Sequence, residues 1–357
     1  MSEQGAVINA QEAELEGPGR HYIQELPILI LFPHNRCNCR CLMCDIWKVR
    51  EMREITSKDM EPHLESLRAL KVRWIVFSGG EPLLHSDLRS LAHMIRSEGI
   101  RLTLLSAGLL LEKQADIVAE WMDDIIISID GPAEVHDAIR DVPLAFERLA
   151  RGICRVRRAR PEMPVHGRCT VQKRNFRHLR DTVRVAREVG LNSISFLAAD
   201  IASEAFNRPL GWPAERLAAV TLDETDVEGL DREIEALIAN CRSEIEAGFI
   251  SESPEKLRRI VGHFRAVLGQ VQPTAPRCNA PWVSAVMEAD GTVRPCFFHQ
   301  PIGNVGRASL AGILNSNAAL EFRRRLDVAN NSICQRCVCS LYLDRDAEGN
   351  CDQGAHV

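Results

Sequence analysis

Long hydrophobic runs are missing from this chain. Its longest strongly apolar stretch, residues 26–32, is much shorter than the roughly 20 residues that a membrane-spanning helix needs. Residues 1–19 are polar and lack the apolar centre of a secretory signal peptide. We therefore expect a cytoplasmic protein that has no membrane partner.

A strong excess of charge of one sign is missing as well. The 44 lysines and arginines against 49 aspartates and glutamates leave a net charge of −5, and 45% of the residues are hydrophobic, as in an ordinary globular protein. The densest basic run, residues 151–160, has apolar residues at helical spacing and is interpreted as the solvated face of a helix. These features predict no nucleic-acid partner.

Cysteine, in contrast, is plentiful: the chain has thirteen. In a protein that is not exported, disulfides are disfavoured and metal or catalytic roles are favoured. Cys37, Cys41 and Cys44 form a C-x3-C-x2-C array directly after the apolar run 28–32. Three thiolates on one loop can hold three irons of a [4Fe–4S] cube and leave the fourth iron open for a ligand. Cys39 could replace Cys37 in this set, although we interpret it as a bystander, and a zinc knuckle is the alternative to a cluster.

This array resembles the signature of the radical S-adenosylmethionine (SAM) superfamily. The resemblance implies that SAM chelates the open iron, and that one electron from the cluster cleaves SAM to a 5′-deoxyadenosyl radical. The family usually has an aromatic residue just before the last cysteine, whereas this chain has Met43. A polarizable thioether can also pack on an adenine face, so Met43 is a predicted SAM contact.

A second motif follows the second predicted strand. In Ser78-Gly79-Gly80-Glu81-Pro82, the glycines let backbone approach a ligand closely, and the glutamate can accept hydrogen bonds from an ammonium. Read alone it is a plain Gly-Pro turn. Downstream of the cysteine array it resembles the Gly-Gly-Glu-Pro motif that holds the SAM amino group in this family.

Apolar runs alternate with amphipathic helical patterns from residue 27 to about 200. Strands are predicted at 28–32, 74–77, 101–105, 124–129, 165–171 and 193–197, and helices at 58–70, 87–98, 112–121, 144–158 and 176–189, the last capped by Asn175. Six such units predict an α/β fold with a parallel sheet. The family resemblance implies an open three-quarter (β/α)6 barrel, with the chemistry on loops after the strands.

Polar residues at further strand ends are weaker candidates for the same site. Ser106 follows the third strand, and Ser128 and Asp130 end the fourth, where they suit ribose hydroxyls. Arg168 on the fifth strand could face the SAM carboxylate or the substrate and is our candidate catalytic residue. Arg140 is a less specific candidate. Each could equally be a strand-end group that bonds to backbone.

A second cysteine group lies near the C-terminus. Two β-prone runs around Asp290-Gly291 predict a hairpin that brings Cys278 and Cys296 together, and Cys334 and Cys337 form a C-x2-C pair beyond it. This resembles the SPASM/twitch extension of radical SAM enzymes, in a form similar to that of 2-deoxy-scyllo-inosamine dehydrogenases. The resemblance implies one auxiliary [4Fe–4S] cluster on these four cysteines, with Cys339 or Cys351 as alternate ligands. A zinc ribbon is the alternative.

These features predict five segments. They are an N-terminal extension (1–26), a partial barrel (27–215), a helical connector (216–272), a small cysteine-rich α+β domain (273–345) and a tail (346–357).

We expect hydrogen abstraction from a small metabolite, such as a sugar, cyclitol or nucleoside, followed by oxidation or rearrangement assisted by the auxiliary cluster. An electron donor such as flavodoxin or ferredoxin is the expected partner. Modification of a ribosomally made peptide is the first alternative, although no leader-recognition domain is evident before the first strand. Epimerisation with a cysteine as hydrogen donor and a zinc-bound scaffold are the others.

Overall fold

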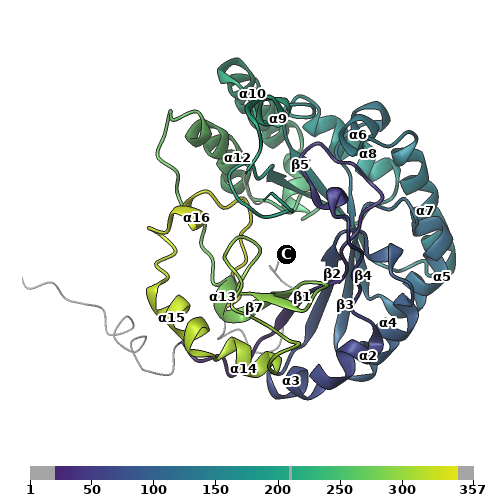
Figure 1. Ribbon diagram of the computed structural model, residues 1–357. Helices are drawn as coiled ribbons and strands as arrows, with labels where there is room; N and C mark the ends of the chain where they lie inside the picture. Colours follow the sequence, from purple (N-terminus) through teal and green to yellow (C-terminus); the bar gives the residue numbers. More distant parts are fainter. Residues whose placement is uncertain (1–20, 209–210, 345–357) are drawn as a thin grey trace, which may run out of the picture.

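A nine-stranded sheet is the framework of the protein (Figure 1). The computed structural model describes residues 21–208 and 211–344. The strands lie in the order β6-β5-β4-β3-β2-β1-β7-β8-β9, in which β1 to β7 pair in parallel and β8 and β9 pair antiparallel. Their bounds are β1 Ile28–His34, β2 Trp74–Gly79, β3 Arg101–Ser106, β4 Asp124–Ser128, β5 Val165–Val171, β6 Ser193–Ala198, β7 Ser284–Met287, β8 Thr292–Arg294 and β9 Gly303–Asn304.

Helices surround the outer face of the curved sheet, as Figure 1 shows. Along the barrel they are α2 Ser57–Met60, α3 Leu64–Ala69, α4 Leu88–Ser97, α5 Leu111–Trp121, α6 Ala133–Arg140, α7 Ala145–Ala159 and α8 Leu179–Glu188, with the 3-10 turns η2 Ile46–Lys48, η3 Glu61–His63 and η4 Pro82–Leu84. The apolar faces of the longer helices pack on the strands in one continuous core. The predicted α/β partial barrel of parallel strands is therefore confirmed.

Two predicted helices differ from the structure. The helix expected at 58–70 is divided by η3, because Pro62 lacks the N–H that a continuous helix needs. The helix expected at 176–189 begins only at Leu179, and Asn175 does not cap it. The Asn175 amide instead donates to the carbonyls of Asp130 and Thr170, both at 3.0 Å, and so joins the ends of two strands.

The segment after β6 is helical, as expected. It contains α9 Ala214–Val220, α10 Glu224–Asn240, α11 Arg242–Glu246 and α12 Pro254–Val267. Helix α9 spans the predicted boundary at 215/216, and α12 packs on β6. None of the helices in the described residues has both the length and the hydropathy that crossing a bilayer requires.

The C-terminal part completes the sheet instead of forming a separate body. Its elements are α13 Ala280–Val283, the strands β7 to β9, α14 Leu310–Leu314, α15 Asn317–Arg325 and α16 Ser332–Gln335. The hairpin predicted around Asp290-Gly291 is confirmed, since β7 and β8 pair antiparallel. Residues 28–31 of β1 hydrogen-bond in parallel with β7, a pairing that the sequence did not predict.

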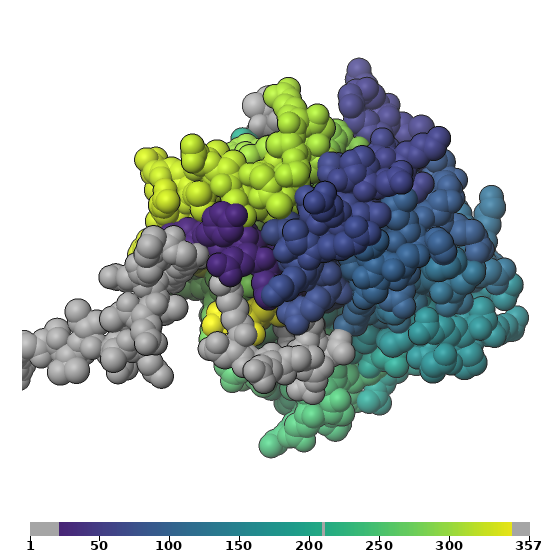
Figure 2. All heavy atoms as spheres, turned by 90° about the horizontal axis from the view of Figure 1, so that it is seen from below, coloured from purple at the N-terminus to yellow at the C-terminus, as the bar shows by residue number. Residues whose placement is uncertain are grey.

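Residues 21–23, the first that the structure describes, contact the C-terminal helical elements. Figure 2 shows this purple segment between the yellow C-terminal region and the blue start of the barrel. The backbone N–H of Ile23 donates to the Asn315 side chain at 2.8 Å, and Arg323 donates to the His21 carbonyl at 2.6 Å. The N-terminal segment therefore packs against α14 and α15.

Candidate active site

The loop after β1, residues 37–44, is held firmly at the mouth of the barrel. The backbone N–H groups of Arg40 and Leu42 donate to the carbonyls of Arg140 and Ile139, both at 3.0 Å. These acceptors lie at the end of α6, so the cysteine loop is fixed to an element that follows β4. Its position depends on the barrel and not only on β1.

Cys37, Cys41 and Cys44 line one cavity of about 210 Å³ at the C-terminal ends of the strands. We call it the SAM cavity. The same cavity is lined by six other predicted SAM-site residues, Met43, Gly79, Gly80, Ser106, Ser128 and Arg140. The structure therefore brings together two motifs that lie about forty residues apart in sequence. Their roles as ligands and SAM contacts remain predictions.

The thiols of this loop have unequal proton affinities. A hydrogen bond from Cys39 lowers the pKa of the Cys41 thiol to about 7, and the nearby Arg140 adds to this effect. Burial raises the pKa of Cys44 to about 12. Cys39 is 1% exposed, and its hydrogen bonds to the Cys37 and Cys41 sulfurs raise its pKa. A buried thiol that hydrogen-bonds within the loop is consistent with the interpretation of Cys39 as a bystander, which stays a prediction.

The cysteine loop fits a cluster better than a single ion. No group of three or more Cys, His, Asp or Glu residues within 21–208 and 211–344 is arranged to hold one metal ion. A zinc site needs all its ligands on one ion, whereas each thiolate of an iron–sulfur cube binds a different iron and lies farther from the others. Three free thiols around a shared cavity, with further polar groups opposite, are a suitable donor set for a three-cysteine cluster and its SAM ligand.

The two glycines are required by a close approach between the two motifs. A Cβ atom on Gly80 would lie 2.1 Å from the carbonyl oxygen of Arg36, and Gly79 has φ +98°. The Glu81 N–H donates to the Arg36 carbonyl at 2.7 Å, and the Gly80 N–H donates to the His34 carbonyl at 3.2 Å. Backbone therefore joins the base of the cysteine loop to the glycine motif.

Glu81 lies beneath the cavity and does not line it. Its side chain is 0% exposed, and its Oε1 accepts hydrogen bonds from Ser106 Oγ at 2.8 Å and from the Leu83 N–H at 3.1 Å. Its Oε2 accepts from the Ala107 N–H at 2.9 Å. A carboxylate has about four acceptor positions, so roughly one is left for an ammonium. Burial raises the pKa of Glu81.

Asp130 is likewise buried and does not line the SAM cavity. Its Oδ2 accepts from Arg140 Nε at 2.7 Å, and its Oδ1 accepts from the Thr170 N–H at 3.1 Å. Arg140 also points Nη1 at the Cys41 sulfur, 3.5 Å away. The pair thus positions the cysteine loop, whereas the ribose contact of Asp130 remains a prediction. Pro82 is buried in the core beside Glu81.

Asp45 and Arg216 are site residues that sequence reasoning missed. Asp45 is 5% exposed and accepts from Trp212 Nε1 at 2.7 Å and from Arg216 Nη2 at 3.1 Å. Arg216 also donates to the carbonyls of Cys41 and Cys44, at 3.3 and 3.4 Å. Together they cover the cysteine loop with residues from α9 and the segment before it. The position of Asp45, directly after Cys44, was the available signal.

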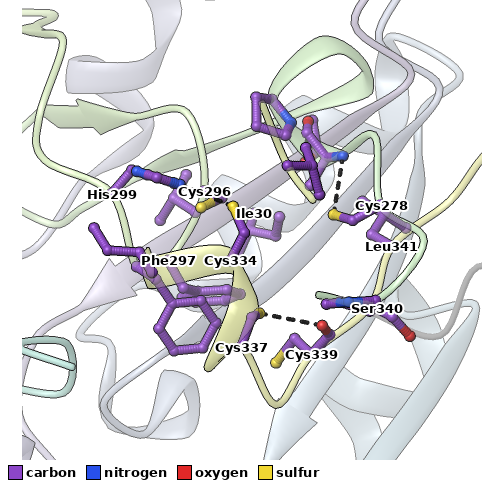
Figure 3. Close-up of a pocket in the computed structure, with 18 residues that line it drawn as sticks. Ile30, Cys278, Cys296, Phe297, His299, Cys334, Cys337, Cys339, Ser340 and Leu341 are labelled. Atoms are coloured by element: carbon purple, nitrogen blue, oxygen red, sulfur yellow. Dashed lines mark hydrogen bonds between the residues drawn. The ribbon is translucent and has the colours of Figure 1, made fainter. Parts of the chain in front are cut away.

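The second cysteine group lies around another cavity, shown in Figure 3. The four predicted ligands line it together with Cys339, so five thiols gather there: Cys278, Cys296, Cys334, Cys337 and Cys339. Ile30 of β1 lines the same cavity, which is about 70 Å³ in volume. Cys351, the other alternate ligand, lies outside the described residues.

His299 is a further residue that the motif search did not single out. It is 5% exposed, and its Nε2 lies 3.4 Å from the Cys334 sulfur. Burial lowers the pKa of His299. Its position two residues after Phe297, and three after Cys296, was the only signal in the sequence.

Two further cavities adjoin the SAM cavity. One, of about 80 Å³, is lined by Arg168 and shares Leu197, Val338 and Cys339 with it. The other, of about 560 Å³, shares Ile46, Gly79, Gly80 and Phe206 with it, and phenylalanines from four positions line it: Phe32, Phe206, Phe297 and Phe298. Arg168 therefore lies beside the SAM cavity and not on its wall.

Comparison with known families agrees with both cysteine groups. Residues 31–186 match the radical SAM superfamily, and residues 278–338 match the SPASM iron–sulfur cluster-binding domain. The chain therefore contains a radical SAM domain followed by a SPASM domain. Its cofactors are accordingly SAM and a [4Fe–4S] cluster, with auxiliary iron–sulfur clusters implied by the SPASM domain. The likeness to the shorter twitch type stays a prediction.

Curated relatives of this chain include proteins named as synthases of heme and of Fe-coproporphyrin III. An AdoMet-dependent heme synthase of Methanosarcina barkeri is 31% identical over 43% of this chain and 45% of its own length. The Fe-coproporphyrin III synthase of the same organism is 24% identical over 87% of this chain and 80% of its own length. This chain thus spans less than half the length of the first of these relatives.

Solved structures share the fold. SuiB of Streptococcus suis, solved with S-adenosylmethionine bound, aligns with a TM-score of 0.64 and 14% identity over 94% of this chain and 77% of that one. The enzyme anSMEcpe with bound AdoMet aligns with a TM-score of 0.63 and 19% identity over 87% and 86%. At these identities the likeness concerns the architecture alone.

Proposed function

We propose that this radical SAM enzyme oxidises an organic substrate bound in the barrel between its two cysteine groups. The observation that carries the proposal is the position of Cys339, which lines both the SAM cavity and the cavity of the second cysteine group. A substrate in the lumen would thus lie within reach of both cofactors. When bound, these groups supply a 5′-deoxyadenosyl radical and an acceptor for one electron, respectively.

The side chains of the site hold the parts in place. Arg140 and Arg216 fix the cysteine loop through its sulfur and its carbonyls. Glu81 fixes the end of β3 through Ser106 and Ala107. The substrate would lose a hydrogen atom and then one further electron, together with a proton or carbon dioxide. This oxidoreductase outcome is the part of the proposal that goes beyond family membership.

We further propose a tetrapyrrole as the substrate. The support comes from the names of the curated relatives and from the cleft of about 560 Å³ beside the SAM cavity. Phenylalanine rings line this cleft, which suits a flat apolar ring. The sugar, cyclitol or nucleoside expected from the sequence finds no support in those relatives.

A peptide is the second candidate substrate. A PqqA peptide cyclase of Ruegeria pomeroyi is 24% identical over 73% of this chain and 65% of its own length. The open cleft would also admit an extended peptide, whose side chain would have to enter the SAM cavity. Epimerisation is a third candidate outcome. In that case Cys339, whose thiol lines the SAM cavity, would donate a hydrogen atom to the substrate radical.

We also propose that a flavodoxin- or ferredoxin-type protein in the cytoplasm supplies the reducing electrons. The division into barrel, connector and SPASM domain is also a proposal. The sheet does not mark a boundary between the barrel and the SPASM domain, because β7 pairs within the same sheet as the barrel strands.

The test is an anaerobic turnover assay with the reconstituted enzyme and dithionite. Iron porphyrins that carry propionate side chains, Fe-coproporphyrin III among them, are offered alongside a metal-free porphyrin and a synthetic peptide library. We expect 5′-deoxyadenosine to rise above the substrate-free level with an oxidised or decarboxylated porphyrin formed in step. Stimulation by peptides alone would refute the tetrapyrrole assignment, and absence of 5′-deoxyadenosine with every substrate would refute the enzyme.

A further inference from the structure

A small cavity opens from the barrel lumen beside the SAM cavity. We call it the basic pocket; it is lined by residues of β5, β6, α12 and the segment 337–340. Because it shares Leu197, Val338 and Cys339 with the SAM cavity, one ligand can occupy both spaces.

Positive charge exceeds negative charge in the basic pocket. Arg168, Lys256 and Arg259 line it, and Glu252 is the one carboxylate among its lining residues. Glu252 already accepts hydrogen bonds from Ser195 Oγ at 2.9 Å and from the Phe196 N–H at 2.8 Å. Within the described ranges, no ion pair joins it to any of the three cations.

Arg168 is a cation without a partner. Residues of β5 alternate between the core and the lumen, and Gly167 and Cys169 face the core, so Arg168 faces the lumen. In the part of the chain that the structure describes, its guanidinium makes no hydrogen bond or ion pair, and its Nε is buried. Burial lowers the pKa of Arg168. A half-buried cation whose Nε is buried without a partner favours an anion beside it.

The size of the basic pocket limits what the anion can be. Its volume, about 80 Å³, is less than half that of the adjoining SAM cavity, about 210 Å³, so it suits a terminal group such as a carboxylate better than a whole metabolite. The planar fork of an arginine matches a carboxylate with two parallel hydrogen bonds. The rest of such a ligand would extend into the SAM cavity.

We propose that the basic pocket binds a carboxylate group of the substrate, with Arg168 as its main partner and Arg259 and Lys256 adding charge. This inference rests on the proposed function, since it assumes a substrate in the lumen. It defines an orientation: the carboxylate lies between β5 and α12, and the carbon that reacts lies toward the SAM cavity. Arg168 is thus a determinant of specificity for acidic substrates.

Two other roles for these arginines must be separated from this one. Arg259 donates to the carbonyl of Cys337 at 2.8 Å and could serve only the second cysteine group. Arg168 could instead face the carboxylate of SAM. If Arg259 serves only the second cysteine group, its substitution lowers the iron content. If Arg168 faces the carboxylate of SAM, its substitution lowers the affinity for SAM.

The test uses the anaerobic holoenzyme and a small probe, succinate, with its uncharged diamide as the match. Calorimetric titration at constant ionic strength should show that succinate binds and the diamide does not. Arg168→Gln should weaken succinate binding roughly tenfold or more, because charge-assisted hydrogen bonds are lost. Arg158→Gln, on the exposed face of α7, is the matched control and should change nothing.

Two further variants test the same contact. If Arg168→Gln does not fold, Arg168→Lys and Lys256→Gln replace it, and each should weaken succinate binding to a smaller degree. Wild-type enzyme that binds neither probe would overturn the proposal. So would unchanged succinate affinity in Arg168→Gln, whether iron content or SAM affinity falls or not. Because succinate is no tetrapyrrole, this result is independent of the porphyrin assay; coproporphyrin III and its tetramethyl ester then link the two.

Discussion

Replacing Glu81 with Gln is the most informative single change, because it affects both folding and SAM binding. The carboxylate accepts three hydrogen bonds, two from backbone N–H groups and one from Ser106. A Gln side chain keeps one oxygen but turns an NH2 group toward a backbone donor. Either amide orientation leaves the N–H of Leu83 or of Ala107 unpaired in a site that is 0% exposed.

The cost can be derived from that one lost bond. A buried donor without a partner costs about 1–3 kcal/mol of unfolding free energy. For a chain of this size, that corresponds to a fall in Tm of roughly 1–4 °C. If Glu81 also accepts from the SAM ammonium, SAM affinity should fall about tenfold or more, because that hydrogen bond is charge-assisted.

The assay combines thermal unfolding with equilibrium SAM titration on anaerobically reconstituted protein. Glu65→Gln on the exposed face of α3 is the matched control, and iron content is measured in both variants. A lower Tm with unchanged SAM affinity would show that Glu81 acts only on the end of β3. Unchanged values for both quantities would refute the whole account of this residue.

Three other changes test the rest of the site. Replacing the three predicted cysteine ligands of residues 37–44 with Ala should abolish 5′-deoxyadenosine formation and leave iron only at the C-terminal site; continued SAM cleavage under reduction would contradict the assignment. Cys278→Ala with Cys296→Ala should remove about half the iron if each site holds one [4Fe–4S] cluster, and stop product formation while uncoupled SAM cleavage persists; a wild-type iron content would mean that these thiols bind nothing. Burial lowers the pKa of His263 from 6.5 to about 4, so the unfolded chain binds the extra proton and the unfolding free energy should fall as pH drops below 6.5, by up to about 3 kcal/mol. Urea titrations from pH 7.5 to 5.5 should show a shallower dependence in His263→Asn, and an equal slope would refute the shift.

The strands of the barrel could be predicted because each is an apolar run of buried-strand length. Four of the six predicted strands begin and end within one residue of the observed ones. The helix predicted at 58–70 is interrupted because the apolar spacing continues through Pro62, whereas the backbone hydrogen bonding does not. Asn175 was misjudged for another reason: its amide has tertiary acceptors, at Asp130 and Thr170, that outweigh a local cap.

The site was predictable where chemistry requires particular residues close together in sequence. The cysteine loop and the glycine motif carry such patterns, and the structure places both at one cavity. Asp45 and Arg216 could not be found this way, because their pairing depends on how α9 folds back over the loop. The same holds for the basic pocket, whose cations come from β5 and α12, far apart in the sequence.

The pairing of β7 with β1 has a consequence for any attempt to shorten the protein. Residues 28–31 are apolar, and their backbone groups bond to β2 on one side and to β7 on the other. A chain cut before β7 would leave β1 as an open, hydrophobic edge that invites pairing with other molecules. The C-terminal domain therefore covers the β1 edge and protects the barrel from aggregation, in addition to any part it has in electron transfer.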